Sequence, residues 1–144
     1  MREVLEALAA GELSVEEAEA QLAGYATGEA GRFDAARVNR SGVPEAILAD
    51  GKTAAEIAAL AETALETTGR AIVTRLAPDD APALREDVGA THPDADVEWN
   101  ERSRWLVATT PDFERPDIAA SVGVVTAGTS DAEPAGEAAM VARE

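Results

Sequence analysis

Hydrophobic residues along this chain alternate between helical spacing and short β-branched runs. Apolar residues three or four positions apart predict amphipathic helices, whereas the run Ala71–Leu76 is typical of a buried strand. The glycine-rich stretch at residues 25–32 predicts a flexible connection. The predicted elements, in order, are a helical hairpin (2–9 and 14–23), a strand (45–49), a helix (54–67), a strand (71–76), a helix (78–86) and a β-hairpin (97–99 and 105–109).

Polar residues and glycine mark the ends of the predicted helices. Ser14 with Glu17, and Thr53 with Glu56, have the spacing of capping boxes, in which each side chain bonds to the other's backbone N–H. Gly69 ends the helix that Thr53 opens. Because a strand, a helix, a strand and a helix follow one another from residue 45, we expect a parallel βαβ unit with a right-handed crossover.

A second β-branched run, Ser121–Thr126, precedes a loop and a stretch compatible with a helix at 137–143. This order predicts a buried strand, a tight loop and a helix start, where backbone N–H groups and hydroxyls face an anion. The alternative is that Ser130 and Asp131 only cap the helix, since capping needs the same residue types. The candidate ligand-binding residues are Gly128, Thr129, Ser130 and Asp131.

The predicted fold class is α/β, in two parts. Residues 1–110 are expected to form an α+β accessory domain, and residues 111–117 a linker. Residues 118–144 then begin a flavodoxin-like parallel sheet with its first strand, loop and helix. Because one strand cannot complete a sheet, its edge is expected to stay disordered or to associate.

Composition and charge narrow the choice of partners. Hydrophobic residues make up 46 % of the chain but aromatic ones only 3 %, so the core should be built on Ala, Val and Leu. The net charge of −16 disfavours nucleic acid, and the spread of the acids favours a salt-tolerant surface of the kind found in salt-loving organisms over a specific acidic patch for a basic partner. No apolar stretch is long enough to span a membrane, so we expect a cytoplasmic protein.

Other candidate chemistry has simpler explanations. His92, the single histidine, stands near Asp94 and Asp96, but this is a weak metal signal and a solvated loop explains it better. With no cysteine, thiolate metal sites and cysteine nucleophiles are excluded from this segment. Trp99 and Trp105 are expected to cover the core or a subunit contact, with base stacking as the alternative.

The sequence Gly51-Lys52-Thr53 invites a phosphate-loop interpretation, which we reject. Ala46 stands where the first glycine of such a loop is needed, and the loop is too short to wrap a phosphate. Lys52 is then a solvated residue. The alternative is that Lys52 and Arg40 contact an anion or another subunit.

Two segments resemble the LarB family, the pyridinium-3,5-biscarboxylic acid mononucleotide synthases of nickel-pincer cofactor assembly. The loop VVTAGTSD is similar to the start of their carboxylase domain, which in turn resembles the aminoimidazole ribonucleotide carboxylases. Val43 replaces an aromatic residue of the family pattern. The residues of the earlier segment that match are Asp34, Arg40, Gly42, Pro44, Glu45, Gly51, Lys52 and Thr53.

The resemblance implies an activity for the full-length family. Such enzymes carboxylate the pyridinium ring of nicotinic acid adenine dinucleotide with carbon dioxide, hydrolyse its phosphoanhydride, and assemble into homo-oligomers. The loop 128–131 would contact phosphate and ribose, with Arg40, Glu45 and Lys52 as accessory residues and no metal. Mg²⁺ is a cofactor to consider only for the full-length family. The cysteine thought to activate the ring is not in this segment, so the chain is expected to be a truncated, inactive half. The alternatives are an aminoimidazole ribonucleotide carboxylase-like protein and a non-catalytic assembly module.

Overall fold

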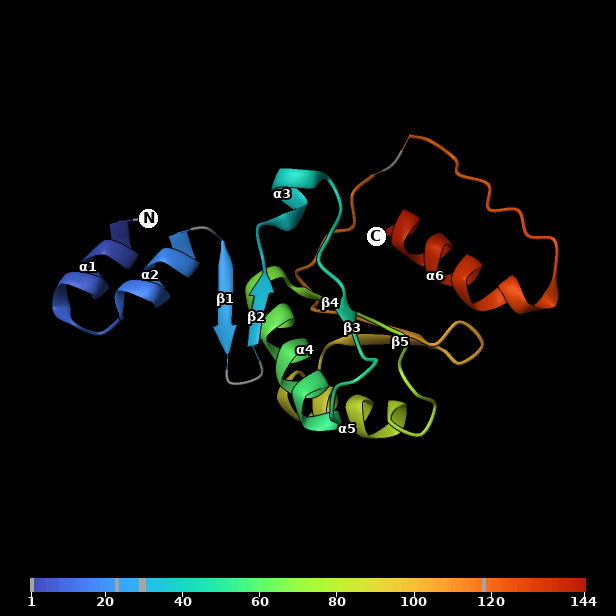
Figure 1. The fold of residues 1–144 in the computed structure, drawn as a ribbon, viewed down its shortest axis with the longest axis horizontal. Coiled ribbons are helices and arrows are strands. Elements are labelled where there is room, and N and C mark those ends of the chain that lie inside the picture. Colours follow the sequence, from blue (N-terminus) through green and yellow to red (C-terminus); the bar gives the residue numbers. More distant parts are fainter. Residues whose placement is uncertain (1, 23, 29–30, 118) are drawn as a thin grey trace.

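The computed structural model of the chain describes residues 2–22, 24–28, 31–117 and 119–144. A helical hairpin projects from one end, a β-hairpin follows it, and an α/β body makes up the rest (Figure 1). The hairpin consists of α1 (Arg2–Ala10) and α2 (Val15–Leu22), as predicted. The Ser14–Glu17 capping box depends on a side chain outside the described part and stays a prediction.

The described residues of the glycine-rich stretch, which was predicted to be flexible, lie in two strands instead. β1 (Tyr25–Gly28) pairs antiparallel with β2 (Gly31–Asp34). Tyr and Thr favour extended backbone. At the end of β2, Phe33 is buried against the main core, which fixes the β-hairpin to the body. The short helix α3 (Arg37–Ser41), absent from the sequence prediction, follows and ends at Gly42, whose φ of 72° is left-handed.

The main sheet has four strands in the order β3-β4-β6-β5. β3 (Ile47–Leu48) runs parallel to β4 (Arg70–Thr74), which confirms the βαβ unit. β6 (Trp105–Thr109) pairs antiparallel with β4 and with β5 (Asp96–Asn100), so the predicted hairpin is also confirmed. The chain is therefore of the α/β class.

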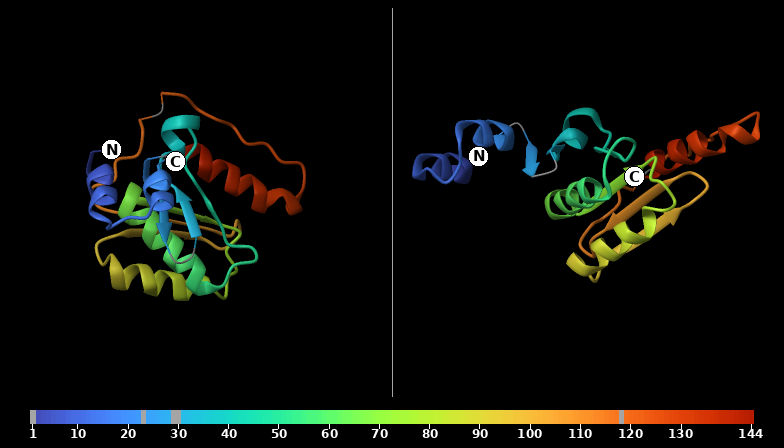
Figure 2. Two further views of the ribbon diagram at one scale, coloured as in Figure 1. Left: turned by 60° about the vertical axis from the view of Figure 1, so that its left-hand side comes forward. Right: turned by 60° about the horizontal axis from the view of Figure 1, so that its bottom comes forward.

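Helices cover both faces of this sheet (Figures 1 and 2). α4 (Ala54–Thr68) and α5 (Ala81–Thr91) cover one face, and α6 (Ala132–Arg143) covers the other. Since successive strand residues point to opposite faces, Ile72 of β4 packs with Met140 of α6, while Val73 joins the α4–α5 core. Trp105 lies in the α6 cluster and Trp99 packs against the α4–α5 core, so both tryptophans cover the core, as expected.

The ends of α4 are those that the sequence predicts. The Thr53 side chain accepts a hydrogen bond from the Glu56 backbone, and the Thr53 backbone N–H donates to the Glu56 carboxylate at 2.7 Å. Gly69 ends the helix at φ 72°. β4 begins at the next residue, so the turn at Gly69 directs the strand back along α4.

The predicted strand at Ser121–Thr126 is wrong for this chain. Residues 119–126 form no helix or strand, and Val122, Val124 and Val125 are 70 %, 43 % and 94 % exposed. A strand needs a neighbour for its N–H and C=O groups, and none of the described strands pairs with this segment. The helix predicted after it does form, as α6, preceded by a 3-10 turn at Thr129–Asp131. The boundary at 111–117 stays a prediction.

A cluster of ion pairs holds the last turn of α6 to the sheet. The Glu144 side chain is fully buried and receives bonds from Arg70, Arg115 and Arg143. Arg115 and Arg143 also reach Glu98 on β5, each at 2.9 Å. Burial lowers the pKa of Arg143, but its hydrogen bonds to Glu98 and Glu144 outweigh burial and the pKa lies above its ordinary value.

Candidate functional site

The candidate site lies at the carboxyl ends of the parallel strands β3 and β4. The two strands stay joined there, since the Ala49 N–H donates to the Thr74 carbonyl at 2.9 Å. The turn Asp50–Lys52 leaves β3 and Arg75 leaves β4 at this edge. In open α/β sheets, ligands bind outside the carboxyl ends of the strands.

Two arginines at this edge have left-handed backbone. Arg75 has φ 55° and Arg104, just before β6, has φ 52°. This region costs a non-glycine residue about 1–2 kcal/mol, and such residues concentrate at functional sites. The Leu76 N–H donates to the Arg104 carbonyl at 2.9 Å, which ties the two strained positions together.

The two side chains have different roles. The Arg104 guanidinium donates to the Leu76 carbonyl at 3.2 Å and to the Arg75 carbonyl at 2.8 Å, so it braces the strand end. The Arg75 side chain is 50 % exposed, and its ion pair with Asp50 is long, at 3.9 Å. Arg75 therefore offers a guanidinium fork to a carboxylate or phosphate.

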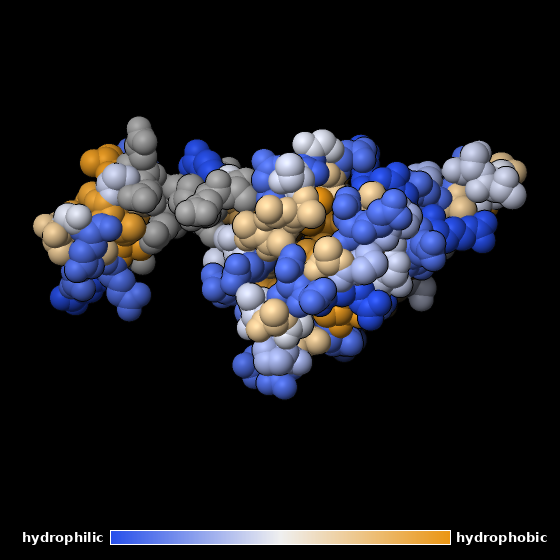
Figure 3. Space-filling model, turned by 90° about the horizontal axis from the view of Figure 1, so that it is seen from below, coloured by the Kyte–Doolittle hydropathy of each residue, from blue (hydrophilic) through white to orange (hydrophobic). Residues whose placement is uncertain are grey.

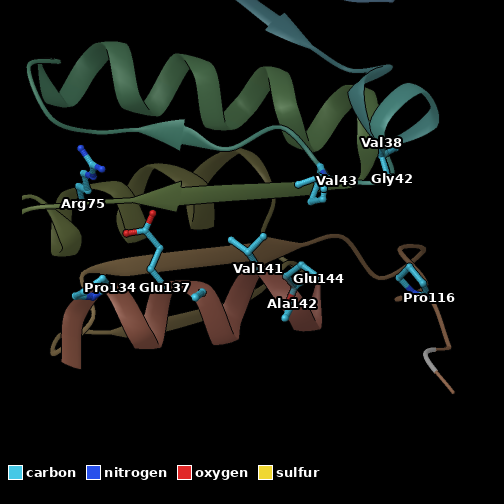
Figure 4. A pocket seen from close by; sticks show the side chains of 12 residues that line it. Val38, Gly42, Val43, Arg75, Pro116, Pro134, Glu137, Val141, Ala142 and Glu144 are labelled. Carbon is cyan, nitrogen blue, oxygen red and sulfur yellow. The ribbon is translucent and has the colours of Figure 1, made fainter. Parts of the chain in front are cut away.

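Arg75 stands at one end of a groove of about 780 Å³ (Figure 4). The segment around α3 forms one wall and α6 forms the other, so the motif residues Gly42 and Pro44 line it. Most lining side chains are apolar. Glu137, in the middle of α6, is an acidic residue on that wall. The groove is therefore mostly apolar along its length and also carries charged side chains. Its other lining residues are Val38, Val43, Pro116, Pro134, Ala138, Val141, Ala142 and Glu144.

The predicted ligand loop, Gly128–Asp131, leads into the first turn of α6. Glu133 in that turn pairs with Arg104 at 3.4 Å, which sets the loop at the same edge of the sheet as Arg75. Asp131 occupies the N-cap position of α6 without a side-chain capping bond, and the 3-10 turn that ends at Asp131 has no side-chain cap either. The capping alternative is therefore not realised in this structure, and the loop residues are exposed.

Two of the predicted accessory residues, Arg40 and Glu45, do not join this loop. Arg40 pairs with Asp34, and Arg37 pairs with Glu45 at 3.3 Å, so these motif residues hold α3 between β2 and β3. They lie before β3, at the end of the sheet opposite to Arg75. The second Asp34 oxygen, Oδ1, is buried and has no hydrogen-bond partner.

Lys52 is exposed beside the α4 capping box, consistent with a solvated residue. Hydrogen bonds from the Thr53 backbone and side chain lower the pKa of Glu56 in that box, and the charge of Lys52 adds to this. Sequence reasoning missed Arg75 and Arg104, because only the positive φ angles and the fold distinguish them from the other arginines.

The described residues contain no group of three or more His, Cys, Asp or Glu side chains that could hold a metal ion. His92 follows α5, and its backbone N–H donates to the Val88 carbonyl at 2.7 Å. In the same part of the chain, no helix is both long and apolar enough to cross a membrane.

The fold and the site define a small α/β domain with a βαβ unit, an arginine-lined strand edge and an attached helix. Comparison with known families specifies it further: the LarB/PurE-like N-terminal domain matches residues 25–110, and the chain belongs to this family. It is 30 % identical over 142 residues to the uncharacterized protein MJ0165 of Methanocaldococcus jannaschii. The match covers 96 % of this chain and 54 % of that relative, so the chain spans about half the relative's length.

Proposed function

We propose that this chain is the first half of a LarB-type enzyme, which carboxylates the pyridinium ring of nicotinic acid adenine dinucleotide and hydrolyses its phosphoanhydride. The observation that carries the proposal is the uncapped loop Gly128–Asp131, which lies at the same strand edge as Arg75. Membership of the LarB/PurE-like family supports it.

Each group at this edge has a role toward the dinucleotide. The N–H groups of the first turn of α6, together with the Ser130 hydroxyl, donate to phosphate oxygens, and the helix dipole favours the same charge. The Asp131 carboxylate accepts from ribose hydroxyls. Arg75 pairs with a second phosphate or with the ring carboxylate, because its fork matches both.

The carboxylation step itself needs residues that this chain does not supply. The 144 residues include no cysteine, so covalent activation of the ring would need a thiol from elsewhere in the complete protein. We therefore expect the chain by itself to bind the dinucleotide without carboxylating it. In the complete protein, carbon dioxide is the co-substrate of this reaction. The complete protein works as a homo-oligomer.

Thermal unfolding of the chain in molar salt tests the binding step. Nicotinic acid adenine dinucleotide, AMP and aminoimidazole ribonucleotide are added separately. At about 100 times its dissociation constant a ligand adds roughly 2.7 kcal/mol, which raises the Tm of a chain of this size by about 5–10 °C. Of the three ligands, we expect only nicotinic acid adenine dinucleotide to raise the Tm.

Two loop variants localise the effect. Ser130→Ala and Asp131→Asn should each remove most of the shift, whereas Asp94→Asn, an exposed carboxylate in another loop, should retain it. A rise with aminoimidazole ribonucleotide alone would favour the purine-type carboxylase. No shift with any ligand, beside a cooperative transition, would contradict the proposal.

A non-catalytic assembly module is the second candidate, and the exposed valines of segment 119–126 favour it. Apolar β-branched residues without a strand partner are typical of a surface that another chain covers. If this function is the correct one, light scattering shows a concentration-dependent oligomer that Val125→Asp dissociates, and no nucleotide changes the Tm.

A further inference from the structure

The α1–α2 hairpin stands apart from everything assigned so far. The family match begins at residue 25, after the hairpin, and none of the described side chains of α1 and α2 lines the groove. In Figures 1 and 2 the two helices project away from the α/β body. Figure 3 shows hydrophobic surface on this projection, next to strongly hydrophilic surface.

The apolar residues of α1 and α2 are only partly buried. Ala18, in the middle of α2, is 1 % exposed, so the inner face of α2 is covered at this point. Val15 and Leu22, each about one helical turn from Ala18 on the same face, are 62 % and 43 % exposed. On α1, Leu5 is 49 % exposed. The apolar stripe therefore extends beyond what the hairpin covers.

Charge around this stripe selects its partner. Residues 1–22 contain six glutamates and one arginine, about a third of the net charge of −16 in under a sixth of the chain. Arg2 pairs with Glu6 at 2.9 Å on the exposed surface. A second acidic hairpin, an anionic membrane or a nucleic acid would meet like charge, whereas a cationic partner is attracted.

We propose that the α1–α2 hairpin is a docking site for a basic amphipathic helix of another protein. The apolar side of that helix lies on Leu5, Val15 and Leu22 and completes a three-helix arrangement. Its lysines and arginines lie beside the glutamates of the hairpin. This interaction is independent of the nucleotide site proposed above.

A pair of synthetic peptides provides the probe. One is an 18-residue Leu/Lys peptide with leucines at helical spacing, and the other has the same composition in an order without that spacing. Fluorescence anisotropy measures binding of each to the full chain in 0.15 M and 1 M NaCl. We expect the amphipathic peptide to bind at least 10-fold more tightly than its scrambled counterpart at both salt concentrations.

Substitutions locate the peptide. Leu5→Gln and Leu22→Gln should each weaken binding several-fold and, together, at least 10-fold. Val125→Gln removes a side chain that is more exposed but lies elsewhere, and it should leave binding unchanged. Circular dichroism checks that each variant keeps its helix content.

Three results would overturn the proposal. Equal affinity for the two peptides would mean that charge alone attracts them. Unchanged binding by the Leu5→Gln/Leu22→Gln variant would place the peptide elsewhere. Self-association of the chain that this double variant abolishes would make a second copy the occupant.

Discussion

The side chains of Arg70 and Glu144 are 74 positions apart in sequence and meet in full burial, with Nη1 and Oε2 3.4 Å apart. Arg70 begins β4 and Glu144 follows α6, so this pair joins the helix to the sheet. The Phe113 ring lies under the Arg70 guanidinium, 4.7 Å from its carbon. Burial lowers the pKa of Arg70, and the charge of Glu144 opposes that change.

Arg70→Met should destabilise the chain through α6. The change leaves the buried Glu144 carboxylate with Arg115 and Arg143 as its remaining partners. Breaking a buried pair costs about 3–5 kcal/mol, and the two remaining arginines should reduce this to about 2 kcal/mol. Urea unfolding measures it. Arg2→Met, at a pair 91 % exposed on the arginine side, is the control and should change stability by less than about 0.5 kcal/mol.

Glu56 should make stability depend on pH. Its pKa in the folded chain is lowered from 4.5, chiefly by the hydrogen bond from the Thr53 backbone, so its contribution is complete above pH 4.5 and is lost as the pH falls through the lower folded value. Wild type should thus exceed Glu56→Gln in stability at pH 7, and the difference should shrink below pH 4.5. Urea midpoints across this range measure the effect. A difference that is constant with pH would contradict it.

Arg75 should lower the stability of the chain through its left-handed backbone while it places a positive charge at the groove. Arg75→Ala keeps a Cβ in the left-handed region, whereas Arg75→Gly relieves it, so the glycine variant should be about 1 kcal/mol more stable than the alanine variant. Both lose the guanidinium and should weaken the dinucleotide shift alike. If the two variants unfold at the same urea concentration, the strain is absent.

Gly136 should report how closely α6 packs on the β5–β6 turn. A Cβ there would lie 1.9 Å from the Ser103 Oγ and 2.6 Å from its Cβ. Gly136→Ala should therefore lower stability by about 1–2 kcal/mol, despite the better helix propensity of alanine. Ser103→Gly in the same chain should restore most of this loss.

Gly89 of α5 is the matched control, because a Cβ at this position meets nothing within 4 Å. Gly89→Ala should stabilise the chain by about 0.5–1 kcal/mol. If Gly136→Ala stabilises by the same amount, α6 does not pack on Ser103 as described. Chemical unfolding of the wild type and of these three variants measures the differences.

Sequence patterns were sufficient wherever neighbouring residues determine structure. The Thr53–Glu56 box, the Gly69 helix end and the β-branched run of β4 are local signals, and each was predicted correctly. Segment 121–126 has the same kind of local signal as β4 but lacks a pairing strand, so pattern alone predicted it wrongly.

Features of the site depend on contacts between distant residues. No local pattern indicates that Arg75 and Arg104 adopt positive φ angles or that Arg104 braces Leu76. The motif from Asp34 to Glu45 was found in the sequence, but its internal ion pairs appear only once α3 is placed between β2 and β3.

The exposed run 119–127 joins two packed parts of the chain. A cut in this run should therefore leave two fragments that stay associated, as in split proteins. Elastase, which cuts after small apolar residues, should cleave there first. The C-terminal fragment should then stay bound, since Met140 and the Glu144 cluster hold it to the sheet without the covalent link. A nicked sample should thus run as two bands in a denaturing gel and as one species in native chromatography, and the two pieces should reassemble after separation.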